Sequence, residues 1–144
     1  MSEVEVAVEC TKAIEAHISD QADEVKKSYA QRARHFHTDI YTIGTAYVIA
    51  TAAARSTAKA VELGLSAPNC EELVKGIGEF KLKSEEKAYA LYGGVLLYAL
   101  KRGNYISSTN LGDAILELSS AQHVTLAAYK YAEWLKKLAE AYFK

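Results

Sequence analysis

The sequence predicts an all-α protein, a single-domain helical bundle of about five to seven helices over residues 1–144. Proline occurs once in the chain, at Pro68. The long stretches between the glycines are rich in Ala, Leu, Glu and Lys, which are strong helix formers. Alternating runs of β-branched residues and the Asn-Gly or Asp-Gly hairpin signal are absent from the sequence. No strand pattern therefore competes with the helical one.

Length and composition support one folded domain. A chain of 144 residues with 50% hydrophobic content is long enough to bury a sizeable core. No uncharged apolar run reaches the roughly 18 residues that a membrane span needs, and the acidic first residues differ from the basic start of a secretory signal. We therefore expect a cytoplasmic protein. In that compartment Cys10 and Cys70, far apart and in no motif, are expected to be reduced, buried thiols.

Three long helices are predicted in the first half of the chain. They cover residues 3–18, 21–37 and 39–63. Ser19 and Asp20 can break and recap the chain between the first two helices. Gly64 fits the left-handed position after the third helix, and Pro68 follows as a stop. The residues expected to face inward are Val4, Val8, Thr11, Ile14 and Ile18 in the first helix and Ile40, Ile43, Tyr47, Ala50 and Ala54 in the third.

Shorter and longer helices alternate in the second half. Asn69 and Glu72 resemble a capping box for a short helix through Val74, and residues 76–83 are predicted as a loop. Ser84 is expected to cap the next helix. The remaining helices cover residues 84–102, 111–118 and 121–142, with a polar linker at 104–110. The inward face of the last helix is predicted to consist of Val124, Ala128, Tyr131, Leu135, Leu138 and Tyr142, and its outer stripe to contain the pairs Glu133–Lys137 and Glu140–Lys144.

Two features of the later helices allow two interpretations each. The Gly93-Gly94 pair costs about 1 kcal/mol per glycine in an exposed helix, so it marks either a close helix–helix approach, which we favour, or a kink. Trp134 lies beside the apolar face of the last helix. It belongs either to the core, which we favour, or to a contact with a partner.

Charge is segregated along the chain although the net charge is only −1. Residues 1–24 carry seven acidic residues against Lys12, a balance of −6, and residues 26–59 carry six basic residues against Asp39, a balance of +5. The candidate RNA-binding residues are Lys26, Lys27, Arg32, Arg34, Arg55, Lys59, Lys101 and Arg102. Tyr29, His35 and Tyr41 could stack on unpaired bases. The alternative is a solvated face that compensates the acidic first helix.

The sequence offers no credible active site, metal site or cofactor site. His35 and His37 are two residues apart and would point in opposite directions on a helix. Only His35 and Asp39 have the spacing of a helical metal pair, and a helix boundary is predicted between them. Cys-x-x-Cys, G-x-S-x-G and Walker motifs are absent from the sequence. We expect a protein that is not an enzyme and needs no cofactor.

The C-terminal run YKYAEWLKKLAEAYFK resembles the end of the small helical subunit of the type III-B CRISPR effector, the Cmr complex. The residues that carry this resemblance are Trp134, Leu135, Lys136, Lys137, Leu138, Ala139, Glu140 and Ala141. A second patch is similar: Phe36, Ile40 and Gly44, followed by the apolar stretch TAYVIATAAA. The family commonly has Pro and Leu where this chain has His37 and Thr45.

The resemblance implies a non-catalytic subunit of an RNA-guided complex. Copies of such a subunit stack with one another into the inner filament, beside the other subunits of the effector complex, along the groove where crRNA and target RNA pair. The resemblance transfers no RNA contact, so the candidate contacts rest on charge alone. Two rival functions are a small helical adaptor that binds a protein partner without nucleic acid, and a metalloenzyme built on His35 and Asp39.

Overall fold

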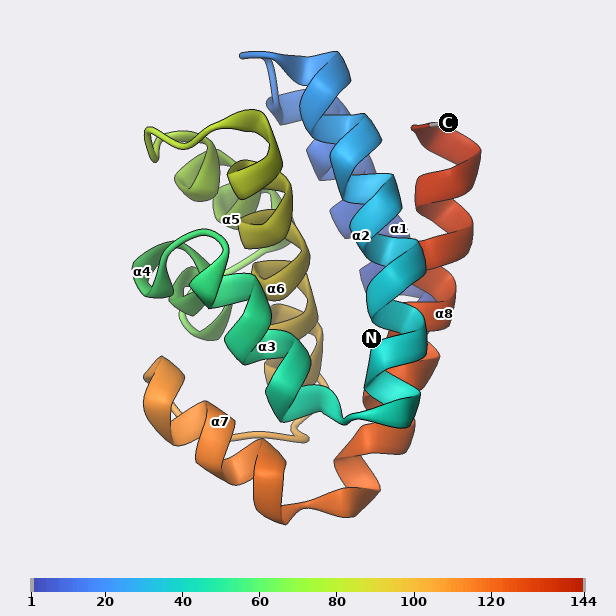
Figure 1. Ribbon diagram of the computed structural model, residues 1–144, viewed down its shortest axis with the longest axis vertical. Helices are drawn as coiled ribbons and strands as arrows, with labels where there is room; N and C mark the ends of the chain where they lie inside the picture. Colours follow the sequence, from blue (N-terminus) through green and yellow to red (C-terminus); the bar gives the residue numbers. More distant parts are fainter. Residues whose placement is uncertain (1, 144) are drawn as a thin grey trace.

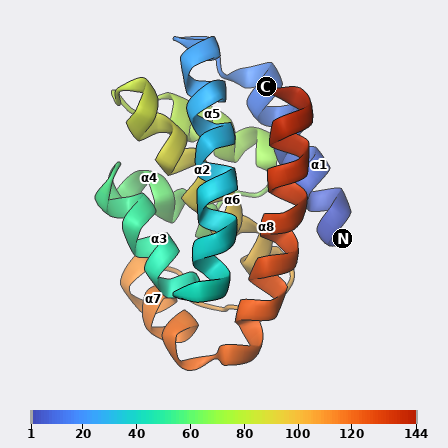
Figure 2. The ribbon, with the colours of Figure 1, turned by 45° about the vertical axis from the view of Figure 1, so that its right-hand side comes forward.

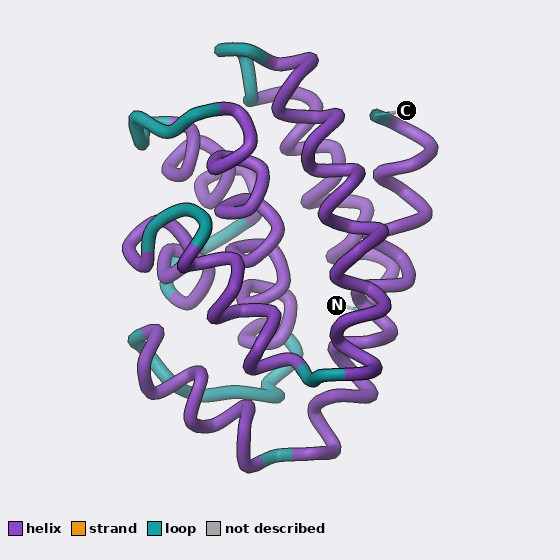
Figure 3. Tube along the Cα trace, viewed as in Figure 1, coloured by secondary structure: helices purple, strands orange, loops and turns teal. Residues whose placement is uncertain are grey.

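The structure, a computed structural model, describes residues 2–143, and no strand occurs among them (Figures 1 and 3). The elements are α1 (Glu3–His17), α2 (Ala22–Thr42), α3 (Thr45–Ala54), α4 (Ala58–Glu62), the 3-10 helix η1 (Leu63–Leu65), α5 (Cys70–Gly78), α6 (Ser84–Arg102), α7 (Leu111–Ser120) and α8 (Gln122–Tyr142). The all-α prediction is confirmed. The eight α-helices of the described range exceed the predicted five to seven because the predicted third helix is broken. None of these helices is both long and apolar enough to cross a membrane.

Short polar side chains start several of these helices. The Ser2 hydroxyl accepts a hydrogen bond from the Glu5 backbone N–H at 3.2 Å, and the Glu5 carboxylate accepts one in return from the Ser2 N–H, which forms a capping box. The Asn69 side chain caps α5 by accepting the Glu72 N–H at 2.8 Å, which is one half of the predicted capping box; the reciprocal hydrogen bond to the Glu72 side chain is not among those of the described residues. The helix continues four residues beyond Val74, to Gly78, so the predicted loop at 76–83 is shorter than expected. Before α6 the N-cap residue is Lys83, not Ser84.

The boundary between α2 and α3 lies at Gly44, not before Asp39. Gly44 has a φ of 118°, a left-handed backbone conformation that side chains disfavour, and this turn redirects the chain. A second break follows Ala54, where the Thr57 hydroxyl accepts the Lys59 N–H at 3.1 Å and starts α4. Helical periodicity does not register the first break, because apolar residues lie on both sides of Gly44. The second break falls at the short polar run Arg55-Ser56-Thr57, which the exposed face of a continuous helix could also carry.

The break at Gly44 also changes which side chains face inward, because α2 and α3 do not continue one helical repeat. Ile40 is fully buried, as predicted, but Ile43 and Tyr47 are 57% and 52% exposed and Ala54 is exposed. In α1 the buried face is rotated from the predicted stripe. Val6, Ala7 and Cys10 join Thr11 and Ile14 inside, whereas Val4 is exposed. The reason is that α1 packs against both α5 and α8, so its buried face is wider than one stripe.

Helix α6 is the centre of the molecule, and every residue from Lys87 to Leu100 is buried. It packs against α1, α2 and α8 on one side and against α3, α4, η1 and α5 on the other (Figures 1 and 2). A Cβ atom on Gly93 would lie 2.8 Å from the Ala52 Cβ, and one on Gly94 would lie 2.8 Å from the Ile77 Cδ1. Close helix–helix approach is therefore confirmed as the reason for the glycine pair.

Gly64 serves the same close approach and is not a left-handed helix end. It lies in η1, and a Cβ atom there would collide with the Gly94 carbonyl oxygen. Its backbone φ is not positive. The prediction for Gly64 was wrong because a glycine after a helical run looks the same in sequence whether it ends the helix or admits a neighbour.

Replacing Gly93 by Ala should lower the free energy of unfolding by about 1–3 kcal/mol, as overpacked cores do, since the Ala52 Cβ is fixed to its helix and has no rotamer to change. Thermal denaturation checks this. Gly112→Ala is the matched control, because its nearest neighbour would be an ordinary 3.6 Å away on exposed α7. That control should gain about 0.5–1 kcal/mol from helix propensity. Equal effects at both sites would contradict the packing argument.

Cys10 and Cys70 form a disulfide, so the prediction of two reduced thiols was wrong. Both side chains are fully buried, and their Cα atoms lie 5.0 Å apart where α1 meets the first residue of α5. The prediction failed because it rested on the redox state of a compartment. The packing of α1 on α5, which brings together residues 60 positions apart, follows only from the tertiary fold.

The Cys10→Ala/Cys70→Ala variant should lose about 4 kcal/mol of stability, the chain-entropy value for a loop of this length. A reductant should lower the Tm of the unchanged chain and leave that of the variant where it is. Alkylation after unfolding without reductant gives a direct control. Two modified cysteines in the unreduced chain would show that the bond does not form.

Helix α8 buries most of its predicted face. Val124, Ala128, Tyr131 and Leu135 are buried, whereas Leu138 is half-buried and Tyr142 is exposed, with Phe143 buried beyond it. Trp134 is 38% exposed, so the interpretation as a core residue was wrong. It lies at the edge of the buried face of α8, where amphipathic periodicity is least decisive. The predicted Glu133–Lys137 pair is present, with 3.5 Å between carboxylate and ammonium. The predicted Glu140–Lys144 pair includes Lys144, which lies outside the described residues.

Candidate nucleic-acid interface

The structure divides the eight predicted basic residues among separate places. Lys27 and Arg34 are seven positions apart on α2 and both are exposed, so they share its outer face. Lys26 is half-buried on the same helix, and Lys59 is exposed on α4. No ion pair within 4.0 Å occupies any of these four side chains among residues 2–143. They remain available to an anion.

Arg32 and Arg55 converge on one side chain that was not predicted, Tyr89 of α6. The Arg32 Nη1 donates a hydrogen bond of 2.6 Å to the Tyr89 hydroxyl, and its guanidinium carbon lies 5.0 Å from the ring centroid. Arg55, at the C-terminal end of α3, lies 6.0 Å from the same centroid. We call these three residues the Arg–Tyr–Arg cluster. Tyr89 was missed because a tyrosine in an apolar helical run has the pattern of a core residue.

Lys101 and Arg102 lie more than three turns along α6 from Tyr89 and hold loops in place. The Lys101 ammonium donates to the carbonyls of Ser107 and Ser108 at 3.0 and 2.7 Å. The Arg102 guanidinium donates to the Pro68 carbonyl at 2.7 Å and lies 5.5 Å from the Tyr98 ring. The structure thus separates this pair from the basic residues of α2, α3 and α4.

Glu117 of α7 holds the same linker from the other side. Its carboxylate accepts the Ser108 hydroxyl at 2.6 Å and the backbone N–H groups of Ser107 and Ser108 at 3.1 Å. These hydrogen bonds, first that of the Ser108 hydroxyl, lower the pKa of Glu117 despite some desolvation. The linker between α6 and α7 is therefore fixed by one carboxylate and one ammonium.

Glu117→Gln should reduce stability at neutral pH by less than about 1 kcal/mol, a small effect because the carboxylate is largely solvated. The pKa of Glu117 is lower in the folded chain than in the unfolded one. Its contribution is therefore present above the unfolded pKa, about 4.3, and is lost as the pH falls through the folded pKa. Thermal denaturation over an acidic pH series checks this. Glu15→Gln is the control, and a Tm difference for Glu117→Gln that persists in strong acid would contradict the assignment.

The histidines do not assemble a metal site. His35 is exposed and Asp39 is half-buried, and both lie within α2, because the helix boundary predicted between them is absent. His37 instead lies 2.5 Å from the Glu133 carboxylate and stacks on Tyr129 with 4.6 Å between ring centroids. Among residues 2–143, no group of three His, Cys, Asp or Glu side chains is placed to hold a metal ion.

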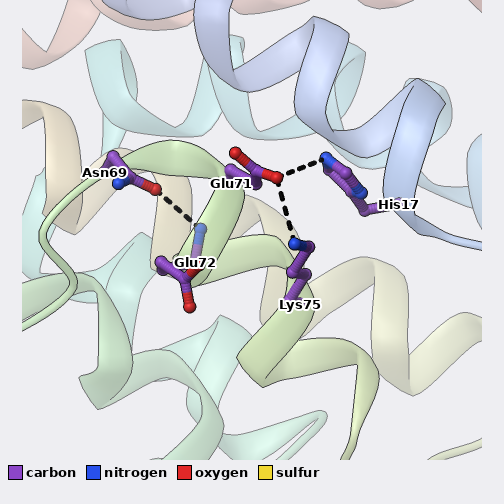
Figure 4. A network of polar contacts seen from close by, with 5 residues as sticks. All are labelled: His17, Asn69, Glu71, Glu72 and Lys75. Atoms are coloured by element: carbon purple, nitrogen blue, oxygen red, sulfur yellow. Dashed lines mark hydrogen bonds and ion pairs between the residues drawn. The ribbon is translucent and has the colours of Figure 1, made fainter.

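His17 belongs to a polar network that joins the end of α1 to α5 (Figure 4). Its Nε2 lies 3.4 Å from the Glu71 carboxylate, which also pairs with the Lys75 ammonium at 3.0 Å. The hydrogen bond and charge of Lys75, followed by the charge of His17, lower the pKa of Glu71. The network lies one residue from Cys70 and reinforces the α1–α5 contact.

The predicted base-stacking residues separate in the same way. Tyr29 is fully buried and packs on Tyr92 with 6.1 Å between ring centroids, so that prediction was wrong. Burial raises the pKa of Tyr29 far above its ordinary value. His35 is exposed, and Tyr41 is 75% exposed at the C-terminal end of α2. Only these two have surfaces that an unpaired base could reach.

Together these observations define a class of protein: a small helical bundle whose polar clusters hold elements together and whose outer α2 face carries unpaired basic residues. A family model described as CRISPR-associated protein (Cas_Cmr5) matches residues 2–142. The chain therefore belongs to this family, the Cmr5 subunits of type III-B CRISPR complexes, and the predicted resemblance is confirmed. No match was found among curated proteins or among solved structures.

The two sequence patches behind the resemblance correspond to two structural units. Gly44 is the left-handed N-cap of α3, and the stretch TAYVIATAAA is helix α3 itself. The C-terminal patch lies in α8, where Leu135 and Ala139 face the core and Trp134 does not. His37, which stands where the family commonly has Pro, continues α2 and pairs with Glu133 of α8.

Proposed function

We propose that this chain is a non-catalytic structural subunit of a type III-B CRISPR effector that stacks into the inner filament and contacts guide or target RNA through a basic face. Family membership supports its place as a Cmr complex subunit. The observation that carries the RNA contact is the pair Lys27 and Arg34, exposed together on the outer face of α2 without ion-pair partners in the described chain. Unpaired cations in a row neutralise phosphates without reading base sequence.

The proposed face has a direct and an indirect part. The direct part consists of basic side chains that have no carboxylate partner among the described residues. They lie on α2, at the end of α3 and on α4: Lys26, Lys27, Arg32, Arg34, Arg55 and Lys59. Lys101 and Arg102 form the indirect part. Their hydrogen bonds to main-chain carbonyls leave their charges intact, so they still attract a polyanion that passes close to them.

Exposed apolar side chains support contacts with other subunits and with further copies of the chain. They lie at the α2–α3 turn, on α7, at the start of α8 and further along α8: Tyr41, Ile43, Tyr47, Leu116, Leu126 and Trp134. Exposed large apolar residues mark protein contacts when they gather. We include in the proposal one domain over residues 1–144 and a cytoplasmic location.

The same side chains favour a second candidate function, a helical adaptor that binds a protein partner and no nucleic acid. Trp134 and Tyr129 line one pocket of about 390 Å³ on α8 together with Glu3, Lys130 and Glu133. A protein side chain could occupy this pocket without any RNA. The two functions differ in whether the cations of α2 contribute to binding.

Replacing both Lys27 and Arg34 by Ala in the assembled complex should weaken binding of single-stranded RNA and reduce its salt dependence. Each lost phosphate contact should lower the slope of log affinity against log salt by roughly 0.7. A titration over a salt series measures both quantities. The fold should be unaffected, since both side chains are exposed.

The matched control is Lys12→Ala/Lys130→Ala, which removes the same charge from exposed positions of α1 and α8. This control should leave affinity and slope nearly unchanged. If the α2 variant behaves like the control while the complex still assembles, the outer α2 face does not bind the RNA and the proposed RNA contact is wrong. The cations of α2 then contribute nothing to binding, as the adaptor function expects.

A further inference from the structure

We propose that the Arg–Tyr–Arg cluster is a phosphate-binding site that holds one phosphodiester of the RNA by shaped hydrogen bonding, in addition to the diffuse attraction of the outer α2 face. This inference rests on the proposed function, because the phosphate belongs to the RNA of the effector complex. It assigns the ligand chemistry to a particular place between α2, α3 and α6.

The first argument is the rigidity of the cluster. Tyr89 is only 6% exposed and its ring packs edge-on against Phe36 with 5.8 Å between centroids. It projects from the fully packed central helix. The 2.6 Å hydrogen bond to its hydroxyl fixes the Arg32 guanidinium at the surface end of this ring. Side chains locked by packing hold a ligand site more accurately than long side chains on an open surface.

The second argument is uncompensated charge. Two guanidinium groups lie within 6.0 Å of one ring centroid, and neither is within 4.0 Å of a carboxylate in residues 2–143. The Arg32 Nε is shielded from solvent and has no hydrogen-bond partner there. Cations held together without a counter-ion repel one another, and an anion between them would relieve this repulsion. The ring offsets part of the cost through its π face.

The neighbouring carboxylates do not already occupy the site. Arg55 and Tyr89 line a pocket of about 340 Å³ with Lys83, Glu85 and Glu86. The Glu86 carboxylate is used at the start of α6, where it accepts the Lys83 N–H at 2.9 Å. Glu85 is exposed and makes no ion pair with Arg55. With Arg32 beside the pocket, the positive groups outnumber the two carboxylates.

The donor set matches a phosphate. A guanidinium presents planar forked donors that fit two oxygens of one phosphate, which an ammonium cannot do. The Tyr89 hydroxyl accepts from Arg32, so its own proton is free to be donated to a phosphate oxygen. The guanidinium forks of Arg32 and Arg55 at the Tyr89 ring, together with its hydroxyl, therefore suit a tetrahedral anion better than they suit an isolated carboxylate.

The first experiment follows the Nε–H resonances of the four arginines, Arg32, Arg34, Arg55 and Arg102, in the full-length chain by ¹H–¹⁵N NMR. Inorganic phosphate is titrated in at constant ionic strength. The resonances of Arg32 and Arg55 should move and saturate together, and those of Arg34 and Arg102 should not. Tyr89→Phe keeps the ring but removes the hydroxyl, and it should abolish the response of Arg32. Equal small shifts at all four arginines would overturn the site.

The second experiment uses substitutions that keep the charge. In the assembled complex, Arg32→Lys and Arg55→Lys should each weaken RNA binding about tenfold, the loss of a charge-assisted hydrogen bond, with the salt slope unchanged. Arg34→Lys is the control on the same helix and should have almost no effect. Melting temperatures verify that the variants are folded. Lysine variants that all bind alike would overturn the site even if RNA binding continues.

The two proposals fail in different ways. If the Lys27/Arg34 alanine variant flattens the salt slope but the lysine variants do nothing, the basic face stands and the shaped site is wrong. If phosphate selectively shifts Arg32 and Arg55 in the isolated chain but no substitution affects RNA, the anion site itself is supported. In that case its assignment to RNA is overturned, and a carboxylate or phosphate of another subunit is its ligand.

Discussion

The burial of α6 from Lys87 to Leu100 is the constraint on which the rest of this structure depends. A helix that is apolar all round must find a neighbour in every direction, and the chain meets this requirement by wrapping seven other elements around it. Space is the limiting quantity. The Gly93-Gly94 pair and Gly64 remove the side chains that would hold α3, η1 and α5 away, so the backbones on that side approach closely. The long helices α2 and α8 close the other side (Figure 2).

This arrangement determines where charge can be placed. The central helix supplies aromatic side chains against which arginines lie: Arg32 of α2 and Arg55 at the end of α3 contact Tyr89, and Arg102 of α6 itself contacts Tyr98. Each such contact holds a flexible arginine side chain against an aromatic ring that is fixed by the core. The basic surface is therefore built on the core, and its geometry follows from the packing of α6.

Periodicity predicted most of the helices but not the breaks among them. The ends of α1, α6 and α8 fall within one residue of prediction. Ser2 caps the start of α1 and Gly103 follows the end of α6, whereas α8 has no side-chain cap and its apolar spacing alone indicates it. The break at Gly44 lies between apolar stretches and is marked by the left-handed φ of Gly44. The break after Ala54 lies at the polar run Arg55-Ser56-Thr57, which the exposed face of a continuous helix could also carry. Sites formed by packing were equally hidden. Neither the Cys10–Cys70 bond nor the position of Tyr89 between two arginines has a local signal, since each joins elements far apart in the sequence.

The segregation of charge persists in the folded molecule. Acidic α1 packs on α5 and α8, and no ion pair joins it to α2 among the described residues, so the acidic helix does not neutralise the outer α2 face. Screening limits each field to about 8 Å at physiological salt, which is less than the width of a helix with its side chains. A polyanion at α2 would therefore experience mainly the local cations. At the same time the net charge is only −1, so copies placed side by side in the proposed filament would avoid the mutual repulsion of a uniformly basic protein. Under the proposed function, this one charge distribution would serve both the attraction of RNA and the close assembly of identical chains.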